Sequence, residues 1–339
     1  MLGVKVKKEN AERVRKVLIS EGVLSNGFIP FSTGDYVFFP IKKEVSVKDA
    51  EIVDVNFKKS SRRPSSLEEA LEEMGIYAKG ILSSFDIIGD IAIVEIPDAL
   101  KEKEKEIGKA ILKIHPNVKT VLKKEGPMAG EFRVRKFGFV AGRRKTKTVY
   151  KENNVKMYMD VAKVYFSPRL SYERARIARK VKEGEKVLAL FAGIGPFPLV
   201  IKKQNPKAEV VAVEINPEAV KYMRKNMRLN HLSFEIIEGD VAKVLKEKRF
   251  QNWADRVLMP LPKGGEHFLK NVFAAAKDGT VVHFYTFASL PFPLDDAEDK
   301  VKRYLPENSY KIIEKRIVRP FSPRIVQVVL DIRIIKRNN

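Results

Sequence analysis

From about residue 162 onward, short apolar runs alternate with longer segments in which apolar residues recur every three or four positions. The short runs have the length of buried strands, and the longer segments have the period of amphipathic helices. Such alternation predicts an α/β domain built on a mostly parallel sheet. We expect strands near residues 186–191, 209–213, 233–237, 254–259 and 280–286, and a helix over residues 217–229.

The last part of the chain departs from this alternation. Residues 311–319 and 326–335 are two strand-like runs, and only the short segment Pro320–Pro323 lies near their junction. Two runs with so short a connection pair in opposite directions, which predicts an antiparallel edge on the sheet. A dehydrogenase sheet would normally remain parallel, so this ending favours a methyltransferase.

The first 161 residues read as two small α+β domains. We predict one domain over residues 1–62, a linker over 63–77, a second domain over 78–161 and the α/β domain over 162–339. The linker follows a polar, basic, proline-containing stretch, which is typical of a boundary. The elements expected before residue 162 are strands near 4–6, 36–41, 51–57, 86–96, 118–122 and 132–134, and helices near 11–20 and 99–114.

A glycine-rich turn follows the first strand of the α/β domain. Gly193-x-Gly195 lets the backbone approach a ligand closely, and Glu214 ends the next strand, where an acid can hold both ribose hydroxyls. Pro198 stands where a dinucleotide-binding motif has its third glycine, which disfavours NAD. Asp240, after the following strand, can meet an adenine amino group and also has the position of a helix N-cap. Together these strand ends suggest a site for S-adenosylmethionine (AdoMet).

Composition narrows the choice of partner. The formal net charge of +22 is better explained by a polyanion such as nucleic acid than by surface solvation. The absence of cysteine excludes disulfides and thiolate metal sites, and the scattered histidines predict no metal centre. The sequence has no run long enough to cross a bilayer and no signal-peptide pattern, so we expect a cytoplasmic protein. Heavy use of Lys, Arg and Glu also fits a thermophile.

The middle domain carries the densest positive charge. Between Lys119 and Lys147 there are many basic residues and only two acids, and aromatic residues are interleaved with them. This combination suits phosphate contact together with stacking on bases, although lysines can also simply protect a sheet edge. The candidate RNA-binding residues of this stretch are Arg135, Lys136, Arg143, Arg144, Lys145 and Lys147.

Several further runs of the sequence are informative when they are taken together and in order. The runs are Phe132-Arg-Val-Arg135, Lys151-Glu-Asn153, Val164-Tyr-Phe-Ser-Pro-Arg-Leu170, Glu173-Arg174, Phe191-Ala-Gly-Ile-Gly-Pro-Phe197, Glu214-Ile-Asn-Pro217 and Glu314-Lys-Arg-Ile-Val-Arg319. They resemble the archaeal tRNA guanine-37 N1-methyltransferases, and the likeness covers essentially the whole chain. The resemblance implies a Rossmann-like class I AdoMet methyltransferase domain with a mixed sheet, preceded by two small α+β domains.

The same resemblance implies a reaction. Guanine N1 carries a proton at neutral pH, so methylation there requires a base and stabilisation of the charge that develops on O6. By similarity, Glu173 would take the proton and Arg133 would hold O6. The family grips the anticodon stem-loop and the outer corner of tRNA and flips out its target base. We expect a monomer.

The resemblance and the motifs together nominate the cofactor site. The candidate AdoMet-binding residues are Tyr165, Arg169, Arg174, Phe191, Ala192, Gly193, Gly195, Glu214, Ile215, Asn216, Asp240, Val241 and Pro260. Pro262 is a further candidate for contact with RNA.

The chain departs from the family pattern at three places. Ala189 replaces a common Asp, Pro260-Leu-Pro262 replaces Asn-Leu-Pro or Asn-Pro-Pro, and Gly142-Arg-Arg-Lys145 replaces Gly-Glu-Asn-Arg. Proline offers neither an amide side chain nor a backbone N–H, so another group must supply that contact. Two alternatives therefore stay open. One is an AdoMet-dependent wyosine-pathway enzyme that transfers a carbon-bound methyl or an aminocarboxypropyl group at the same nucleotide, and the other is a non-catalytic tRNA-binding protein.

Overall fold

The computed structural model describes residues 1–339 except 26, 61–63, 77–84, 131, 133 and 337–339. The chain forms two compact units. One unit comprises Met1–Phe85, Val94–Lys123 and Phe139–Arg144, and the other comprises Asp86–Ile93, Lys124–Gly138 and Lys145–Asn339. None of the helices in the described part of the chain is long and apolar enough to cross a membrane.

The N-terminal region is a small antiparallel sheet with one helix. Its strands lie in the order β2-β3-β1-β4. Val14 and Leu18 of the helix are fully buried against Val4 and Val6 of β1, so one face of the helix closes the core. The elements are β1 (Leu2–Lys7), α1 (Ala11–Ser20), β2 (Phe31–Thr33), β3 (Tyr36–Pro40) and β4 (Ala50–Asp54).

The middle region contains a four-stranded sheet of order β5-β6-β7-β8 and two helices. The stretch expected as a linker holds the first helix, because Ser66 caps it by accepting a hydrogen bond from the Glu69 N–H, and Ala70 and Leu71 are buried. A 3₁₀ segment, Asp98–Lys103, leads into the second helix. The elements are α2 (Leu67–Glu72), β5 (Phe85–Ile88), β6 (Ile91–Val94), α3 (Glu104–Ile114), β7 (Thr120–Ala129) and β8 (Val134–Gly142).

A hairpin of β9 (Lys147–Glu152) and β10 (Val155–Asp160) then packs against helix α6 (Pro217–Leu229). Two asparagines of that helix hold the hairpin, because the side-chain oxygens of Asn226 and Asn230 accept the N–H groups of Tyr158 and Lys156 at 2.7 Å. The expected domain boundaries at residues 62, 77 and 161 stay predictions. This hairpin nevertheless contacts the α/β layer, although it lies before residue 162.

The rest of the chain is a seven-stranded mixed sheet of order β13-β12-β11-β14-β15-β17-β16. The first five strands of this order are parallel, and β17 pairs antiparallel with both β15 and β16, so the antiparallel edge is confirmed. The strands are β11 (Lys186–Ala189), β12 (Glu209–Glu214), β13 (Glu235–Glu238), β14 (Arg256–Met259), β15 (Val281–Ser289), β16 (Tyr310–Ser322) and β17 (Ile325–Ile334).

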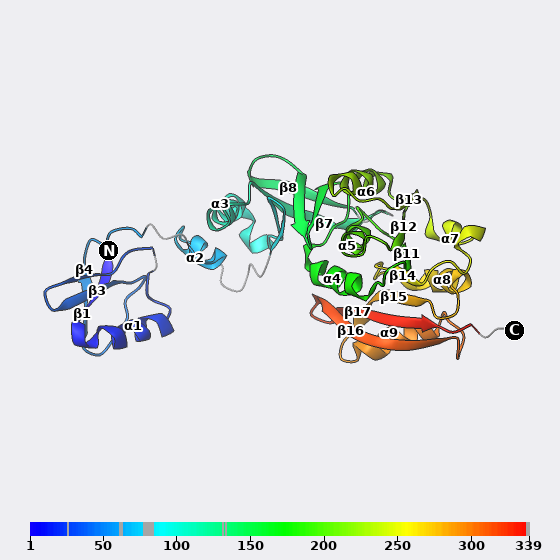
Figure 1. Ribbon diagram of the computed structural model, residues 1–339. Coiled ribbons are helices and arrows are strands. Elements are labelled where there is room, and N and C mark those ends of the chain that lie inside the picture. Colours follow the sequence, from blue (N-terminus) through cyan, green and yellow to red (C-terminus); the bar gives the residue numbers. More distant parts are fainter. Residues whose placement is uncertain (26, 61–63, 77–84, 131, 133, 337–339) are drawn as a thin grey trace. The chain divides into compact units, whose positions relative to one another are not determined.

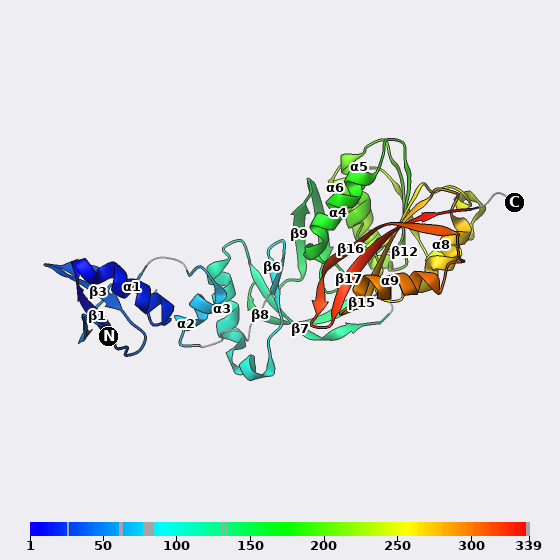
Figure 2. The ribbon, with the colours of Figure 1, turned by 90° about the horizontal axis from the view of Figure 1, so that it is seen from below.

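Helices cover both faces of this sheet, as Figures 1 and 2 show. Alternate residues of a strand point to opposite faces. Val211 and Val213 of β12 join the large core beneath α7, α8 and α9, whereas Ala212 packs on Met223 of α6. The remaining helices are α4 (Ser171–Lys180), α5 (Pro196–Gln204), α7 (Val241–Val244), α8 (Leu269–Ala275) and α9 (Pro293–Lys302).

Candidate AdoMet and substrate site

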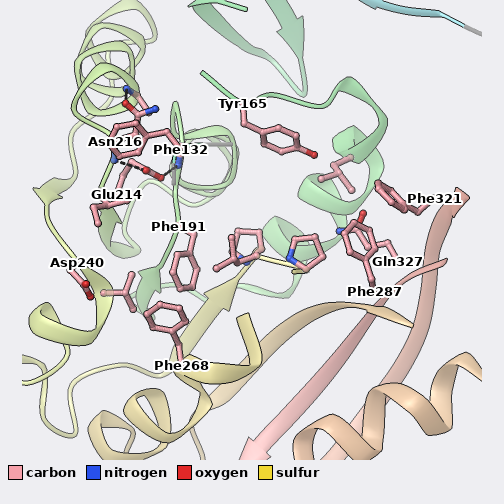
Figure 3. Close-up of a pocket in the computed structure, with 18 residues that line it drawn as sticks. Phe132, Tyr165, Phe191, Glu214, Asn216, Asp240, Phe268, Phe287, Phe321 and Gln327 are labelled. Carbon is pink, nitrogen blue, oxygen red and sulfur yellow. Dashed lines mark hydrogen bonds between the residues drawn. The ribbon is translucent and has the colours of Figure 1, made fainter. Parts of the chain in front are cut away.

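A cavity of about 270 Å³ lies at the carboxyl ends of the parallel strands. In open α/β sheets, ligands bind at this edge, where loops follow the strands. Figure 3 shows the cavity running from Glu214 and Asp240 at one end to Phe287, Phe321 and Gln327 at the other. Its wall also includes Phe132, Leu170, Ala219, Leu261, Pro262 and Phe268.

The turn after β11 is shaped by residues with positive φ. Phe191, Gly193 and Gly195 have φ of 52°, 57° and 86°, and a non-glycine residue in this region carries strain that often marks a functional site. The ring of Phe191 reaches the cavity and packs edge-on against Phe268, with the centroids 4.9 Å apart. The chain thus turns sharply beneath the ligand cavity.

The two glycines of this turn have different roles. Gly193 lies on the cavity wall. Gly195 does not, and a Cβ there would meet Met223 Cγ at 2.7 Å. Gly195 therefore makes room for helix α6 rather than for a ligand, which the glycine spacing alone could not reveal.

Glu214 anchors the nucleoside end of the cavity. Its carboxylate accepts the Gly193 N–H at 2.7 Å on one oxygen and the Asn216 N–H at 2.8 Å on the other. Burial raises the pKa of Glu214, and these backbone hydrogen bonds partly oppose the rise. Each carboxylate oxygen keeps further acceptor capacity for a ligand hydroxyl.

Asp240 combines the two roles that its position allowed. It caps α7 by accepting the Ala242 N–H at 2.6 Å, and it also lies on the cavity wall. Ile215 and Val241 add apolar surface nearby. An adenosine moiety needs apolar faces for its base and an acid for its ribose, so these residues fit AdoMet.

The candidate cofactor residues divide into two groups. Those on the cavity wall are Tyr165, Phe191, Gly193, Glu214, Ile215, Asn216, Asp240, Val241 and Pro260. Arg169, Arg174, Ala192 and Gly195 do not line it. Arg169 pairs with Asp86 at 2.6 Å, and the almost fully buried Arg174 pairs with Glu152, so each guanidinium is directed to a partner within the protein.

The candidate base, Glu173, lies behind the cavity wall rather than on it. Its buried carboxylate accepts hydrogen bonds from the Arg176 guanidinium at 2.6–3.0 Å and from the Tyr285 hydroxyl at 2.7 Å. Tyr285 and the cavity residue Phe287 share one face of β15. Arg133, the second candidate catalytic residue, lies outside the described residues.

A buried network of charges continues from Glu173 beneath α4. Arg176 also contacts Asp331 at 3.2 Å, and Asp331 accepts hydrogen bonds from Lys180 and from His283 Nδ1 at 2.6 Å. Burial lowers the pKa of His283, and Arg256, which can only donate, lies against its Nε2 at 2.6 Å. His283 is therefore a neutral structural residue, and the described residues contain no cluster able to hold a metal.

The candidate RNA-binding residues of the middle region are mostly exposed. Arg135 donates to the Gly126 carbonyl at 3.1 Å, and the Arg144 guanidinium lies 4.6 Å from the Phe139 ring centroid. Lys145 forms an ion pair with Asp90. Among the residues that the structure describes, no carboxylate lies within 4 Å of the charged groups of Lys136, Arg143 and Lys147. Pro262 instead lines the cavity.

Comparison with known proteins decides the family. Residues 148–313 match the TRM5/TYW2 methyltransferase domain, residues 67–146 the TYW2 N-terminal domain, and residues 3–51 the tRNA methyltransferase 5 N-terminal domain. The chain is 38% identical to the tRNA (guanine(37)-N(1))-methyltransferase Trm5b of Pyrococcus abyssi, over 98% of this chain and 99% of that one.

The chain belongs to the TRM5/TYW2 methyltransferase family. A solved complex of aTrm5 with tRNALeu superposes with a TM-score of 0.71 at 33% identity, covering 98% of this chain and 100% of that one. A further TRM5/TYW2 relative is an aminocarboxypropyltransferase of Pyrococcus horikoshii that acts on 4-demethylwyosine(37) of tRNA(Phe). It is 32% identical over 74% of this chain and 88% of its own. The resemblance read from the sequence and the expected fold class are thereby confirmed.

Proposed function

We propose that this protein transfers the methyl group of AdoMet to N1 of guanine 37 in tRNA. The observation that carries the proposal is the cavity with Glu214 at its nucleoside end, in a chain that spans nearly the full length of a Trm5b relative. The relative named for aminocarboxypropyl transfer covers only 74% of this chain. A match to the tRNA methyltransferase 5 N-terminal domain at residues 3–51 further supports methylation of guanine.

The cofactor end of the cavity supplies orientation. Bound AdoMet provides an activated methyl group. Glu214 would accept hydrogen bonds from the ribose hydroxyls and Asp240 from the adenine amino group, while Ile215 and Val241 enclose the base. When both AdoMet and the target base are held in position, methyl transfer no longer requires the two to meet by chance. This lowers the entropic part of the activation free energy.

The opposite end has the character of a nucleobase site. Phe287 and Phe321 present flat apolar surfaces with ring centroids 4.2 Å apart, and Tyr165 is also on the wall and 44% exposed. Aromatic faces of this kind stack on an extruded base. The Gln327 side chain adds a polar group that can hydrogen-bond to a base edge.

Glu173 and Arg133 are our candidates for the proton acceptor and for the group that stabilises O6. To reach a base in the cavity, the Glu173 carboxylate must turn away from Arg176 and Tyr285, its present partners. The N1–H of the flipped guanine would donate a hydrogen bond that replaces those from Arg176 and Tyr285. The Glu173 carboxylate would therefore face the cavity only when the substrate is bound.

The basic residues of the middle region are our candidates for the grip on the anticodon stem-loop, and the N-terminal domain for contact with the outer corner of tRNA. A solved relative in complex with tRNALeu supports tRNA as the partner. A monomeric state and a cytoplasmic location stay predictions.

Transfer of radiolabel from AdoMet tests the function, with the label placed in the methyl group in one assay and in the carboxyl group in a second. We expect methyl label in a tRNA transcript with G37 and none in a matched transcript with A37. Methyl or carboxyl label that appears only when the transcript carries 4-demethylwyosine at position 37 would favour the wyosine-pathway alternative, because an aminocarboxypropyl group carries the carboxyl label and leaves the methyl group behind. Binding of both transcripts without label from either donor would favour a non-catalytic protein.

A further inference from the structure

An unusual aromatic residue stands on the surface between α4 and β16. Tyr172 of α4 is 62% exposed, and the guanidinium groups of Arg316 and Arg179 lie 4.8 and 5.9 Å from its ring centroid. Cations over an aromatic face hold the ring in place. The result is an exposed, preorganised ring with two positive charges held over it.

No carboxylate of the described residues pairs with either of these charges. On the same helix, Arg176 and Lys180 point inward and pair with Asp331 and Glu314. Arg179 and Arg316 have no carboxylate within 4 Å in the part of the chain that the structure describes. Arg176 and Lys180 of the helix thus form an inner, paired set. Arg179 of the helix and Arg316 of β16 form an outer set that can bind an external anion.

The outer set continues to the mouth of the cavity. β16 is the edge strand of the sheet, and from Arg316 it runs on to Arg319 and Phe321, roughly 16 Å further along. Arg319 Nε donates to the Gln327 side-chain oxygen at 2.9 Å, and Gln327 and Phe321 both line the cavity. Figure 3 shows Phe321 and Gln327 together at this end. We call Arg179, Tyr172, Arg316, Arg319 and Phe321 the α4–β16 strip.

We propose that the α4–β16 strip binds the single-stranded ribose-phosphate backbone of the nucleotides next to the target nucleotide. Single-strand sites combine cations that track the backbone with aromatic faces for stacking, and a guanidinium binds phosphate through paired hydrogen bonds. An acidic peptide could also meet the cations, but Phe321 ties the strip to the cavity that receives the base. The inference rests on the proposed function, since it takes RNA as the substrate.

The test measures the Kd of the full-length protein for an anticodon stem-loop RNA with G37, over a range of salt concentrations. We expect Arg316→Ala to raise Kd about tenfold, because a hydrogen bond to a charged group is lost. Its log Kd should depend on log salt concentration with a slope smaller by about 0.7–0.9. Tyr172→Ala should raise Kd as well, since it removes the surface that holds both guanidiniums.

The matched control is Arg333→Ala on β17, which removes an exposed arginine from the opposite end of the same sheet. Its Kd for the stem-loop should equal that of the wild type, and neither arginine variant should change the Kd for AdoMet. Wild-type Kd and salt slope in Arg316→Ala and Tyr172→Ala would overturn the proposal. So would tighter competition by an acidic peptide than by the stem-loop.

These outcomes are separable from failure of the proposed function. A wild-type protein that binds the stem-loop but transfers no methyl group to G37 would refute the function and leave the strip supported. A protein that methylates G37 normally while the strip variants keep the wild-type KM for RNA would refute the strip alone.

Discussion

Glu214→Gln is the substitution that most sharply tests the cofactor site. The amide has nearly the same shape as the carboxylate, so packing at the end of β12 is retained. The carboxylate accepts one backbone N–H on each oxygen, from Gly193 and Asn216. An amide has only one acceptor oxygen, so one of these N–H groups must then face an NH₂ group.

The structure sets the size of the expected effect. A hydrogen bond to a charged group contributes about 1.5–3 kcal/mol, which corresponds to a loss of AdoMet affinity of roughly 10- to 150-fold if one ribose contact is lost. The N–H left without an acceptor costs about 1–3 kcal/mol in the free protein as well, so the free energy of unfolding should fall.

Titration calorimetry with AdoMet measures the affinity, and thermal unfolding measures the stability. Glu238→Gln is the matched control, because Glu238 is exposed at the end of β13 directly opposite Glu214 and does not line the cavity. Wild-type affinity in Glu214→Gln, or an equal loss in both variants, would refute the assignment of Glu214 to the ribose.

Three further predictions concern titration, stability and turnover. AdoMet binding should weaken as the pH falls, because protonation removes the negative charge that accepts the ribose hydrogen bonds. The weakening should begin at a higher pH than for an ordinary glutamate, because burial raises the pKa of Glu214. An AdoMet affinity of the wild type that does not change with pH in calorimetry would contradict this. Asp331→Asn should lower the free energy of unfolding by about 3–5 kcal/mol and Tm by roughly 10 °C, because the cations Arg176 and Lys180 lose a buried partner. An unchanged melting curve would show that the network does not stabilise the fold. Glu173→Gln should lower single-turnover methylation about 10²- to 10⁴-fold while AdoMet and tRNA still bind, and wild-type turnover in a folded variant would exclude Glu173 as the base.

The acid dependence of stability gives the Asp331 prediction a second readout. Burial alone would raise the pKa of Asp331, but the hydrogen bond from His283 and the neighbouring cations hold it well below its usual range. A carboxylate with a lowered pKa contributes stability above its unfolded pKa and loses it as the pH falls through the folded value. Wild type and Asp331→Asn should therefore differ most near neutral pH and converge in strong acid.

Much of the sheet and the cofactor end of the site could be predicted from local sequence. Helix α6 begins and ends where its apolar period and the cap at Asn216 require. The turn after β11 and the acid at the end of β12 carry their chemistry within a few residues of a strand, so strand order alone brings Gly193 and Glu214 together.

The substrate end of the site could not be read in the same way. Phe287 lies in an apolar run and looks like a core residue, whereas Phe268 and Phe321 are single aromatic residues among polar residues and prolines. The sheet topology alone places the three around one cavity. The two strand-like runs at the end of the chain predict that β16 and β17 pair. They do not predict that Phe321 and Gln327 face the cavity from these strands.

Charged residues were the least predictable because many of their partners are distant in the sequence. Glu173 and Arg174 are adjacent, yet one pairs with Arg176 and Tyr285 and the other with Glu152. Arg176 reaches Asp331, 155 residues away. A sequence pattern shows which side chains can carry charge, whereas burial and long-range pairing decide which of them remain available to a ligand.

The central claim, methyl transfer to N1 of guanine 37, is tested most directly by mass spectrometry of nucleosides from a G37 transcript incubated with the protein and AdoMet. We predict a single new product that coelutes with authentic N1-methylguanosine and is absent from an A37 control. A G37 transcript that stays unmodified under conditions where AdoMet binds, or a methyl group found on another atom, would contradict the account.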